Sequence, residues 1–180
     1  MGKRSNFPKI GKDKYNTPAR AVWPLLAHLE PGATYAEPCA GRGDLIRHLS
    51  DDGFECRYAS DIAPHNRFSP LQIEKRDFRK VTAAMLRNCD LVITNPPWTR
   101  EVLHPLVEHF LALKAAWYLW DADWLHNTES SRLVKRSAKI VSIGRVKWFP
   151  GSESAGKENC MWIFFPQNHF DGPKFVGRKG

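Results

Sequence analysis

The sequence has no long apolar run. Its longest mostly apolar stretch, residues 110–120, contains Lys114 and is far too short to span a bilayer. The chain also begins without the apolar core of a secretory signal, because polar residues follow Lys3 and Arg4. These two absences lead us to expect a cytoplasmic protein.

Metal-binding patterns are missing as well. The four cysteines form no C-x-x-C pair, and the seven histidines include no H-E-x-x-H arrangement. Widely spaced cysteines are typical of reduced thiols in a cytoplasmic protein rather than of a zinc knuckle. We therefore predict no metal site, and free thiols at Cys39, Cys56, Cys89 and Cys160.

Acidic residues are the scarcer charged class. The 27 lysines and arginines outnumber the 19 acidic residues and give a net charge of +8, which favours a polyanionic partner, nucleic acid first. Basic residues are concentrated at both ends of the chain. We therefore expect a flexible basic arm over residues 1–14, a single catalytic domain over residues 15–170, and a basic tail over residues 171–180. Either terminal segment can equally serve only to keep the protein soluble.

Apolar residues make up 42% of the chain, enough for one globular domain. Strand-like segments alternate with helix-like ones, which predicts an α/β fold with a mainly parallel sheet and helices on both faces. The last two strands have no helix between them and should form an antiparallel hairpin. The seven expected strands cover residues 34–37, 54–60, 72–73, 91–94, 115–120, 139–148 and 160–165. The expected helices cover residues 18–29, 44–52, 81–87 and 102–111, with a partly helical stretch over residues 123–137.

A glycine-containing loop, residues 37–43 (EPCAGRG), joins the first expected strand to a helix. Two glycines let the backbone approach a ligand closely. The third glycine of the dinucleotide fingerprint is missing, because Ile46 takes its place, and the carboxylate of Glu37 would repel a pyrophosphate. The loop therefore suits a ligand that presents an amine and no phosphate here. A tight strand-to-helix turn alone would also account for the glycines.

Further polar residues follow the ends of other expected strands. Asp61 can accept hydrogen bonds from two ribose hydroxyls, or it can be an ordinary turn aspartate. Asp77 can accept from an adenine amine with Phe78 against the ring, or the pair can be a loop aspartate and a core phenylalanine. Because the carboxyl ends of parallel strands meet at one edge of a sheet, we expect these residues to lie near the N-P-P-W motif at positions 95–98.

Taken together, these motifs resemble those of S-adenosylmethionine-dependent DNA amino-methyltransferases, most closely the N6-adenine type. The resemblance covers residues 15–165 and depends on E-P-x-x-G-x-G and N-P-P-W occurring together. It implies a Rossmann-like class I methyltransferase fold with S-adenosylmethionine as cofactor. Within it, Glu37 and the loop backbone hold the methionine moiety, closed off by Thr17, while Asp61 holds the ribose. The implied cofactor-binding residues are Tyr15, Thr17, Glu37, Pro38, Ala40, Gly41, Gly43, Asp61, Ile62, Asp77, Phe78 and Asn95.

The chemistry of the N-P-P-W motif fits methyl transfer to an exocyclic amine. The side-chain oxygen of Asn95 and the carbonyl of Pro96 can accept the amine hydrogens and free the nitrogen lone pair to attack the methyl group. Pro96 and Pro97 fix the carbonyl direction in advance. Trp98 offers a face for stacking on a base flipped out of the duplex, a contact worth about 1–3 kcal/mol. A strand-ending turn with a core tryptophan is the plainer interpretation.

Residues near the end of the chain are expected to complete the substrate site. Trp148 and Phe149 would add aromatic surface beside the base, and Lys157 would meet a phosphate. A core position for the aromatic residues and a solvated charge for the lysine are the alternatives.

Few residues remain after the motif for a separate target-recognition domain. We therefore expect a compact, phage-like enzyme of a bacterial or phage-infected cytoplasm, with low or short sequence specificity and affinity dominated by DNA phosphates. The alternatives are an RNA base methyltransferase acting on adenine N6 or guanine N2, then an N4-cytosine or a protein glutamine methyltransferase. A non-catalytic nucleic-acid-binding protein on the same fold is a further possibility.

Overall fold

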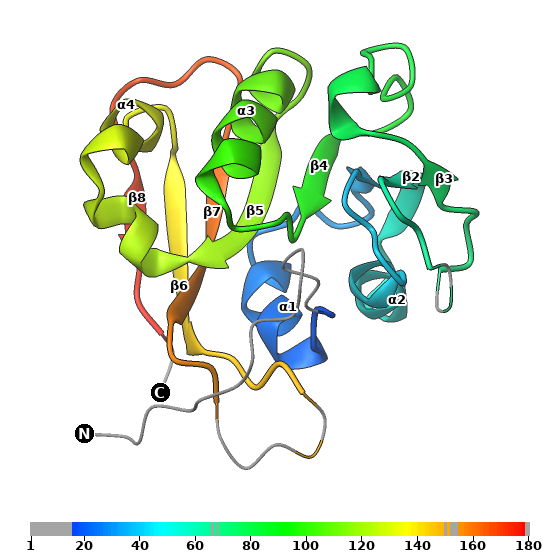
Figure 1. Ribbon diagram of the computed structural model, residues 1–180, viewed down its shortest axis with the longest axis horizontal. Coiled ribbons are helices and arrows are strands. Elements are labelled where there is room, and N and C mark those ends of the chain that lie inside the picture. The colour runs from blue at the N-terminus through cyan, green and yellow to red at the C-terminus, as the bar shows by residue number, and fades with distance from the viewer. Residues whose placement is uncertain (1–15, 66, 68, 150, 152–154, 179–180) are drawn as a thin grey trace.

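The computed structural model describes residues 16–178 apart from residues 66, 68, 150 and 152–154, so the basic arm and Tyr15 lie outside the described residues. Within these described residues, eight strands form one sheet in the order β3-β2-β1-β4-β5-β7-β6-β8 (Figure 1). The strands are β1 (Thr34–Glu37), β2 (Glu55–Asp61), β3 (Glu74–Lys75), β4 (Leu91–Thr94), β5 (Ala116–Asp121), β6 (Lys139–Arg145), β7 (Asn159–Phe165) and β8 (Lys174–Val176).

Strand directions confirm the expected architecture. β3, β2, β1, β4 and β5 run parallel to one another, and β7 runs antiparallel to both β5 and β6. The sheet has eight strands rather than the expected seven, because Lys174–Val176, assigned above to a basic tail, pair in parallel with β6. Three residues carry too little alternation to be recognised as a strand, and this one forms against an edge supplied by the rest of the fold.

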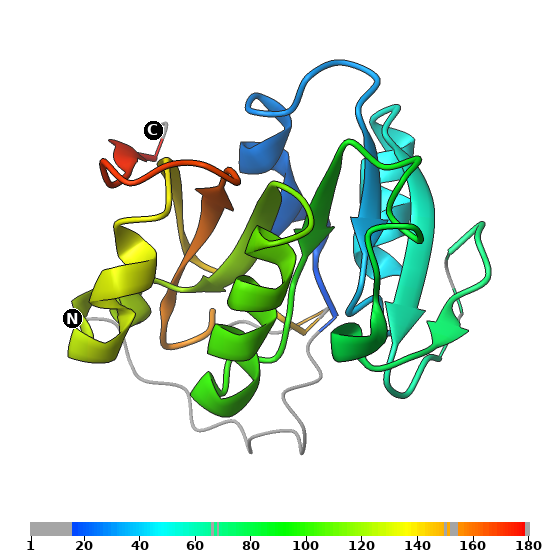
Figure 2. The ribbon, with the colours of Figure 1, turned by 90° about the horizontal axis from the view of Figure 1, so that it is seen from above.

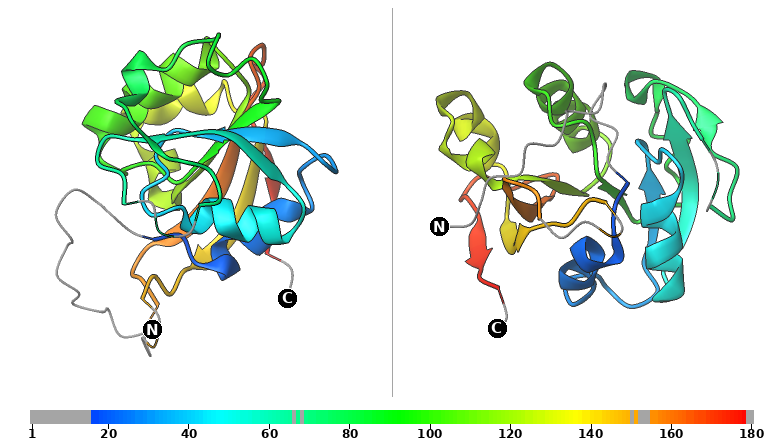
Figure 3. Two further views of the ribbon diagram at one scale, coloured as in Figure 1. Left: turned by 90° about the vertical axis from the view of Figure 1, so that its right-hand side faces the viewer. Right: turned by 60° about the horizontal axis from the view of Figure 1, so that its bottom comes forward.

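Helices cover both faces of the sheet (Figure 2). α1 and α2 lie side by side on one face, as Figure 3 shows, and pack on a core that includes Val22, Leu49 and Trp162. α3 packs on the other face against residues such as Tyr118. The helices are α1 (Ala19–Leu26), α2 (Asp44–Asp51), α3 (Arg100–Leu111) and α4 (Ser131–Val134), with 3-10 helices η1 (Phe78–Lys80), η2 (Ala122–His126) and η3 (Thr128–Ser130). Within the described residues, no helix is long and apolar enough to cross a membrane.

The helix expected over residues 81–87 is absent. The segment instead makes successive turns, in which Met85 donates to the Thr82 carbonyl and Leu86 to the Ala83 carbonyl. Only Val81 and Leu86 are buried within it, and a short segment with few apolar anchors gains too little to offset helix nucleation.

β6 also ends earlier than the pattern predicts, at Arg145 instead of Trp148. Its register against β7 shifts between Ser142 and Gly144, and Gly144 has a φ of 72°, in the left-handed region. A bulge of this kind bends a strand and ends its regular pairing. Trp148 is consequently released from the sheet into the segment between β6 and β7.

One buried hydrogen bond joins α1 to the sheet in addition to its apolar packing. Trp162, fully buried on β7, donates its indole N–H to the Ala21 carbonyl at 2.6 Å. The bond joins the helix to the centre of the sheet and so fixes where the residues just before α1, including Thr17, enter the fold.

Trp162→Phe should therefore lower the free energy of unfolding by about 2 kcal/mol, because it removes this bond and leaves a gap in the core. Urea unfolding would measure the change. Trp23→Phe is the matched control on α1, since Trp23 is 57% exposed and should change stability by less than about 0.5 kcal/mol. Equal losses in the two variants would contradict the anchoring role.

Candidate active site at the carboxyl ends of the strands

The carboxyl ends of β1, β2 and β4 bring the predicted motifs together, because these strands are neighbours in the sheet (Figure 1). Glu37 ends β1, Asp61 ends β2, and Asn95 follows directly after β4. Asp61 Oδ2 accepts a hydrogen bond from the Gly41 N–H at 2.9 Å. Thr94 Oγ1, the last side chain of β4, donates to Glu37 Oε1 at 2.5 Å. The three strand ends therefore form one connected site.

Glu37 is a buried carboxyl group, only 1% exposed. Besides the bond from Thr94, its Oε1 accepts from the Cys39 N–H at 3.0 Å. Burial raises the pKa of Glu37 to about 8, although the bonds from Thr94 and Cys39 oppose the shift. Within the described residues Glu37 forms no ion pair, so its ionised form would be stabilised by a cationic ligand at the end of β1.

The loop after Glu37 is a tight turn that opens α2. The Gly43 N–H donates to the Ala40 carbonyl at 2.7 Å, and Ala40 N–H donates to the Ser60 carbonyl of β2 at 3.0 Å. Gly43 has a φ of 86°, and a Cβ built on it would lie 2.6 Å from the Ser69 backbone nitrogen. Glycine is therefore required at position 43 both by conformation and by space.

Asp61 ties this loop to the end of β2. One carboxylate oxygen accepts from Gly41, and the other accepts from the Ala63 N–H at 2.7 Å. Asp61 thus makes the hydrogen bonds of a turn aspartate. Each of its carboxylate oxygens can still accept a further hydrogen bond. Ile62, the next residue, is an exposed apolar side chain with 63% of its surface accessible.

Asp77 and Phe78 are less directly joined to the site. Asp77 caps η1 by accepting from the Arg79 N–H at 2.9 Å and pairs with its guanidinium at 3.0 Å. Burial raises the pKa of Asp77, but the bonds from Arg79 outweigh it and hold the pKa below its ordinary value. The Phe78 ring is buried in the core, with its edge toward His109 at 6.1 Å between ring centres. The structure therefore places the ring as a core phenylalanine, and adenine binding by this pair stays a prediction.

Asn95 is held between two elements distant in sequence. Its side-chain Nδ2 donates to Thr17 Oγ1 at 3.1 Å, and its Oδ1 accepts from Trp98 Nε1 at 3.3 Å. The same indole N–H reaches the Leu119 carbonyl of β5 at 3.2 Å. Thr17 is buried and lies just before α1. The family resemblance implies a cofactor role for Thr17, whereas its hydrogen bond to Asn95 and the hydrogen bond from Trp98 to Leu119 carry no sequence signal.

Two of the aromatic residues predicted for the substrate site, Trp98 and Trp148, are in contact. The Trp98 and Trp148 rings are 5.4 Å apart between centres, at 74° to one another. Gly156 packs against Trp148, since an added Cβ would lie 3.1 Å from its indole nitrogen. Phe149 is half-buried, and Lys157 is exposed, as is Lys147. The segment between β6 and β7 thus brings an aromatic ring to the motif and carries two exposed lysines.

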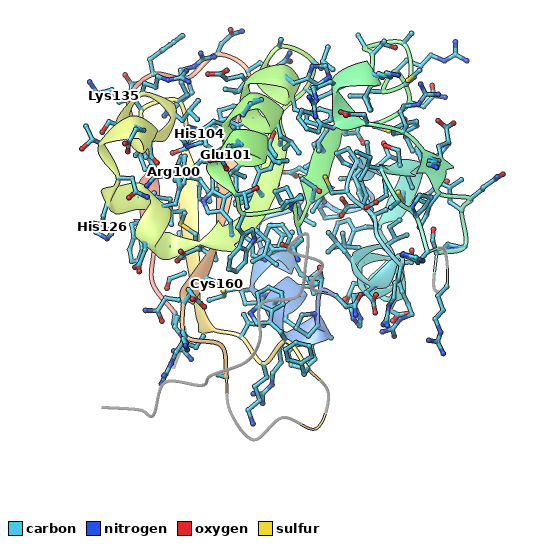
Figure 4. The ribbon with its side chains drawn as sticks, viewed as in Figure 1. Arg100, Glu101, His104, His126, Lys135 and Cys160 are labelled. Carbon is cyan, nitrogen blue, oxygen red and sulfur yellow. The ribbon has the colours of Figure 1, made fainter. Side chains whose placement is uncertain are left out.

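A mixed set of charges lies beside the motif, on α3. Figure 4 shows Arg100, Glu101 and His104 on this helix, which begins directly after Thr99. Arg100 pairs with Glu129 at 3.4 Å. The cation that follows the N-P-P-W motif is therefore already engaged with an acidic side chain.

The four cysteine thiols are free, as predicted. Among the residues that the structure describes, no group of three or more His, Cys, Asp and Glu side chains is placed to hold a metal ion. The prediction of no metal site stays a prediction.

Neither a protein-family model nor a curated protein matches the sequence, but solved structures share its fold. The methyltransferase subunit of a type I restriction-modification system from Streptococcus thermophilus aligns with a TM-score of 0.62 and 12% identity, over 92% of this chain and 49% of that one. A candidate RNA methyltransferase from Pyrococcus horikoshii aligns with a TM-score of 0.59 and 16% identity, over 91% and 93% of the two chains. Magnesium protoporphyrin IX methyltransferase from Synechocystis PCC 6803, solved with bound SAM, aligns with a TM-score of 0.52 and 13% identity, over 81% and 76%. The chain has the Rossmann-like fold of class I methyltransferases.

Gly43→Ala should lower the free energy of unfolding by about 3 kcal/mol, the sum of a left-handed backbone penalty and a collision with the Ser69 backbone. Gly32→Ala is the matched control, because Gly32 also has a positive φ, 74°, but an added Cβ meets no described atom within 4 Å. It should lose only about 1 kcal/mol, the backbone part. Urea unfolding of both variants tests this, and equal losses would remove the steric requirement at position 43.

Glu37 should make stability depend on pH. Its pKa is about 8 in the folded protein and near the ordinary 4.5 when unfolded, so the folded state holds more protons between these values. The stability that Glu37 contributes is therefore present at pH 5 and is lost progressively as the pH rises toward 8. Urea unfolding at pH 5, 6.5 and 8 should show a steeper decline for the wild type than for Glu37→Gln. Parallel pH profiles would mean that the carboxyl group is ionised throughout this range.

Proposed function

We propose that this protein transfers the methyl group of S-adenosylmethionine to the exocyclic N6 amine of adenine in DNA. The observation that carries the proposal is the placement of the Asn95 amide. It follows the end of β4, where it is hydrogen-bonded to Thr17 and Trp98. The preceding residue, Thr94, is hydrogen-bonded to Glu37. A side chain suited to activating an amine thus adjoins a loop suited to a cationic cofactor.

The residues of the site fit S-adenosylmethionine. Glu37 is buried without a cationic partner in the described residues, and it would hold the ammonium of the methionine moiety. Asp61 would accept from the ribose hydroxyls, and the exposed Ile62 side chain would cover part of the adenine ring. The magnesium protoporphyrin methyltransferase with bound SAM shows that this fold can carry the cofactor. Its sulfonium supplies an electrophilic methyl group and a neutral leaving group.

Asn95 and Pro96 would activate the amine. An exocyclic adenine nitrogen is a poor nucleophile, because its lone pair is delocalised into the ring. Hydrogen bonds from its N–H groups to Asn95 Oδ1 and to the Pro96 carbonyl draw it toward a tetrahedral geometry. The nitrogen would then take the methyl group as the carbon–sulfur bond breaks, the neutral thioether would leave, and the proton lost by the nitrogen would pass to water. The hydrogen bonds with Thr17 and Trp98 hold the Asn95 side chain before any substrate binds, which would lower the reorganisation needed in the transition state.

The surroundings of Asn95 favour a nucleobase as the carrier of the amine. Trp98 and Trp148 offer aromatic surface beside it, and the exposed Lys147 and Lys157 flank Trp148 in sequence. The net charge of +8 and the likeness to a type I restriction-modification methyltransferase subunit support DNA. Short loops provide little surface for reading bases, so we infer low sequence specificity with affinity dominated by phosphate contacts.

An RNA base is the second candidate substrate. It is favoured by the likeness to the candidate RNA methyltransferase from Pyrococcus horikoshii, of which 93% is covered. A flipped or single-stranded adenine presents the same amine in both nucleic acids, and the 2′-hydroxyl is the group that distinguishes them.

The decisive experiment supplies the protein with labelled S-adenosylmethionine and with DNA, RNA or a protein mixture, followed by digestion and mass spectrometry. We expect N6-methyladenine from DNA, at adenines in many sequence contexts. Asn95→Ala should lower the rate at least about 100-fold, since it removes an acceptor used in the transition state, while cofactor binding stays within about threefold.

Asn168→Ala, at an exposed position between β7 and β8, is the control and should keep the wild-type rate. Label confined to RNA or to protein would overturn the DNA assignment. Strict reading of a six-base site would overturn the inferred low specificity, and full activity of Asn95→Ala would overturn the mechanism.

A further inference from the structure

The indole N–H of Trp98 is shared between two acceptors. It lies 3.3 Å from Asn95 Oδ1 and 3.2 Å from the Leu119 carbonyl oxygen. Leu119 is fully buried in the middle of β5, where it pairs with Trp162 of β7. Through the Trp98 indole, the Asn95 amide is therefore linked to the rigid centre of the sheet as well as to its own loop.

The chemistry of the two neighbours decides which way round the Asn95 amide lies. An indole N–H can only donate, so the amide atom that faces Trp98 must be the oxygen. The amide nitrogen then faces Thr17 Oγ1, a hydroxyl oxygen that accepts its hydrogen at 3.1 Å. In the opposite orientation the donor groups of Trp98 and Asn95 would face one another. Both hydrogen bonds form in one orientation only.

We propose that Trp98 is a positioning residue, whose indole N–H, together with the Thr17 hydroxyl, fixes the Asn95 amide with its oxygen toward the substrate amine. This inference rests on the proposed function and adds a role for the edge of the Trp98 ring that stacking on a base does not require. An amide oxygen can accept two hydrogen bonds, so a bond from Trp98 is compatible with a second from the amine. An amide in the opposite orientation presents its own N–H groups to the amine and cannot accept a hydrogen bond from it.

Trp98→Phe separates the two roles, because it keeps an aromatic face and removes the N–H. We expect kcat on DNA to fall about 10- to 100-fold, the range expected from misplacing one reacting group, with KM for DNA within about threefold. Trp124→Phe is the control: it removes an indole N–H that donates to His104 on α3 (Figure 4), and kcat should stay within about twofold. An unchanged kcat for Trp98→Phe, or a rise in KM alone, would overturn the positioning role.

The Asn95 amide can also be observed without any turnover. In the NMR spectrum of protein labelled with ¹⁵N-asparagine, the Asn95 side-chain resonance is the one that is missing from the spectrum of Asn95→Ala. We expect an ordered side chain in the wild type and in Trp124→Phe, and a mobile one in Trp98→Phe. Equal order in all three would overturn the proposal. Because this readout needs no substrate, it stands even if the wild type transfers no methyl group to DNA, so failure of the proposed function can be told apart from failure of the positioning role.

Thr17 provides an independent test of the other half of the arrangement. Thr17→Val keeps the shape of the side chain and removes the hydroxyl, whereas Thr17→Ser retains an acceptor. We expect Thr17→Val to lower kcat, and to increase the mobility of the Asn95 side chain, more than Thr17→Ser does. Equal behaviour of the two variants would show that the hydroxyl does not orient the amide.

Discussion

The hydrogen bond from Thr94 to Glu37 is the interaction on which the rest of the site depends. It joins the last residues of β1 and β4, neighbouring parallel strands, and both side chains are buried. Breaking it would leave a polar group unpaired in the core, so separating the two strand ends costs free energy. The glycine loop begins directly after Glu37, and the N-P-P-W motif begins directly after Thr94. One buried contact thus joins the start of the glycine loop to the start of the N-P-P-W motif.

The antiparallel direction of β7 brings the segment between β6 and β7 to the site. Because β7 runs opposite to β5, it starts where β5 ends, with Cys160 paired to Asp121 (Figure 4 labels Cys160). The residues just before β7, including Gly156, are therefore returned to the carboxyl edge of the parallel strands. The bulge at Gly144 ends β6 early and leaves Trp148 in the same connection, where Gly156 packs against it. A sheet with parallel strands throughout would carry this connection to the opposite edge.

Much of this arrangement is predictable from the sequence, because it depends on local signals. Apolar runs ended by Glu37, Asp61 and Asn95 mark the strand ends, and parallel strands bring such ends to one edge. What sequence patterns do not predict is set by contacts between distant residues. The short strand β8 exists only against β6, and the Phe78 ring turns into the core beside His109. The bond between Thr17 and Asn95 joins residues far apart in the chain, so no spacing rule can reveal it.

Under the proposed function, cofactor binding and amine activation share one strand end. An ammonium placed beside Glu37 favours its ionised form, and a carboxylate accepts a stronger hydrogen bond from Thr94 than a carboxylic acid does. Thr94 is followed directly by Asn95, whose amide is oriented by Thr17 and Trp98. Binding of the methyl donor would therefore stiffen the backbone just before the side chain that positions the acceptor. Under this proposal the Glu37 carboxylate would be more than a cofactor ligand, because its ionisation would strengthen the hydrogen bond at the strand end that carries Asn95.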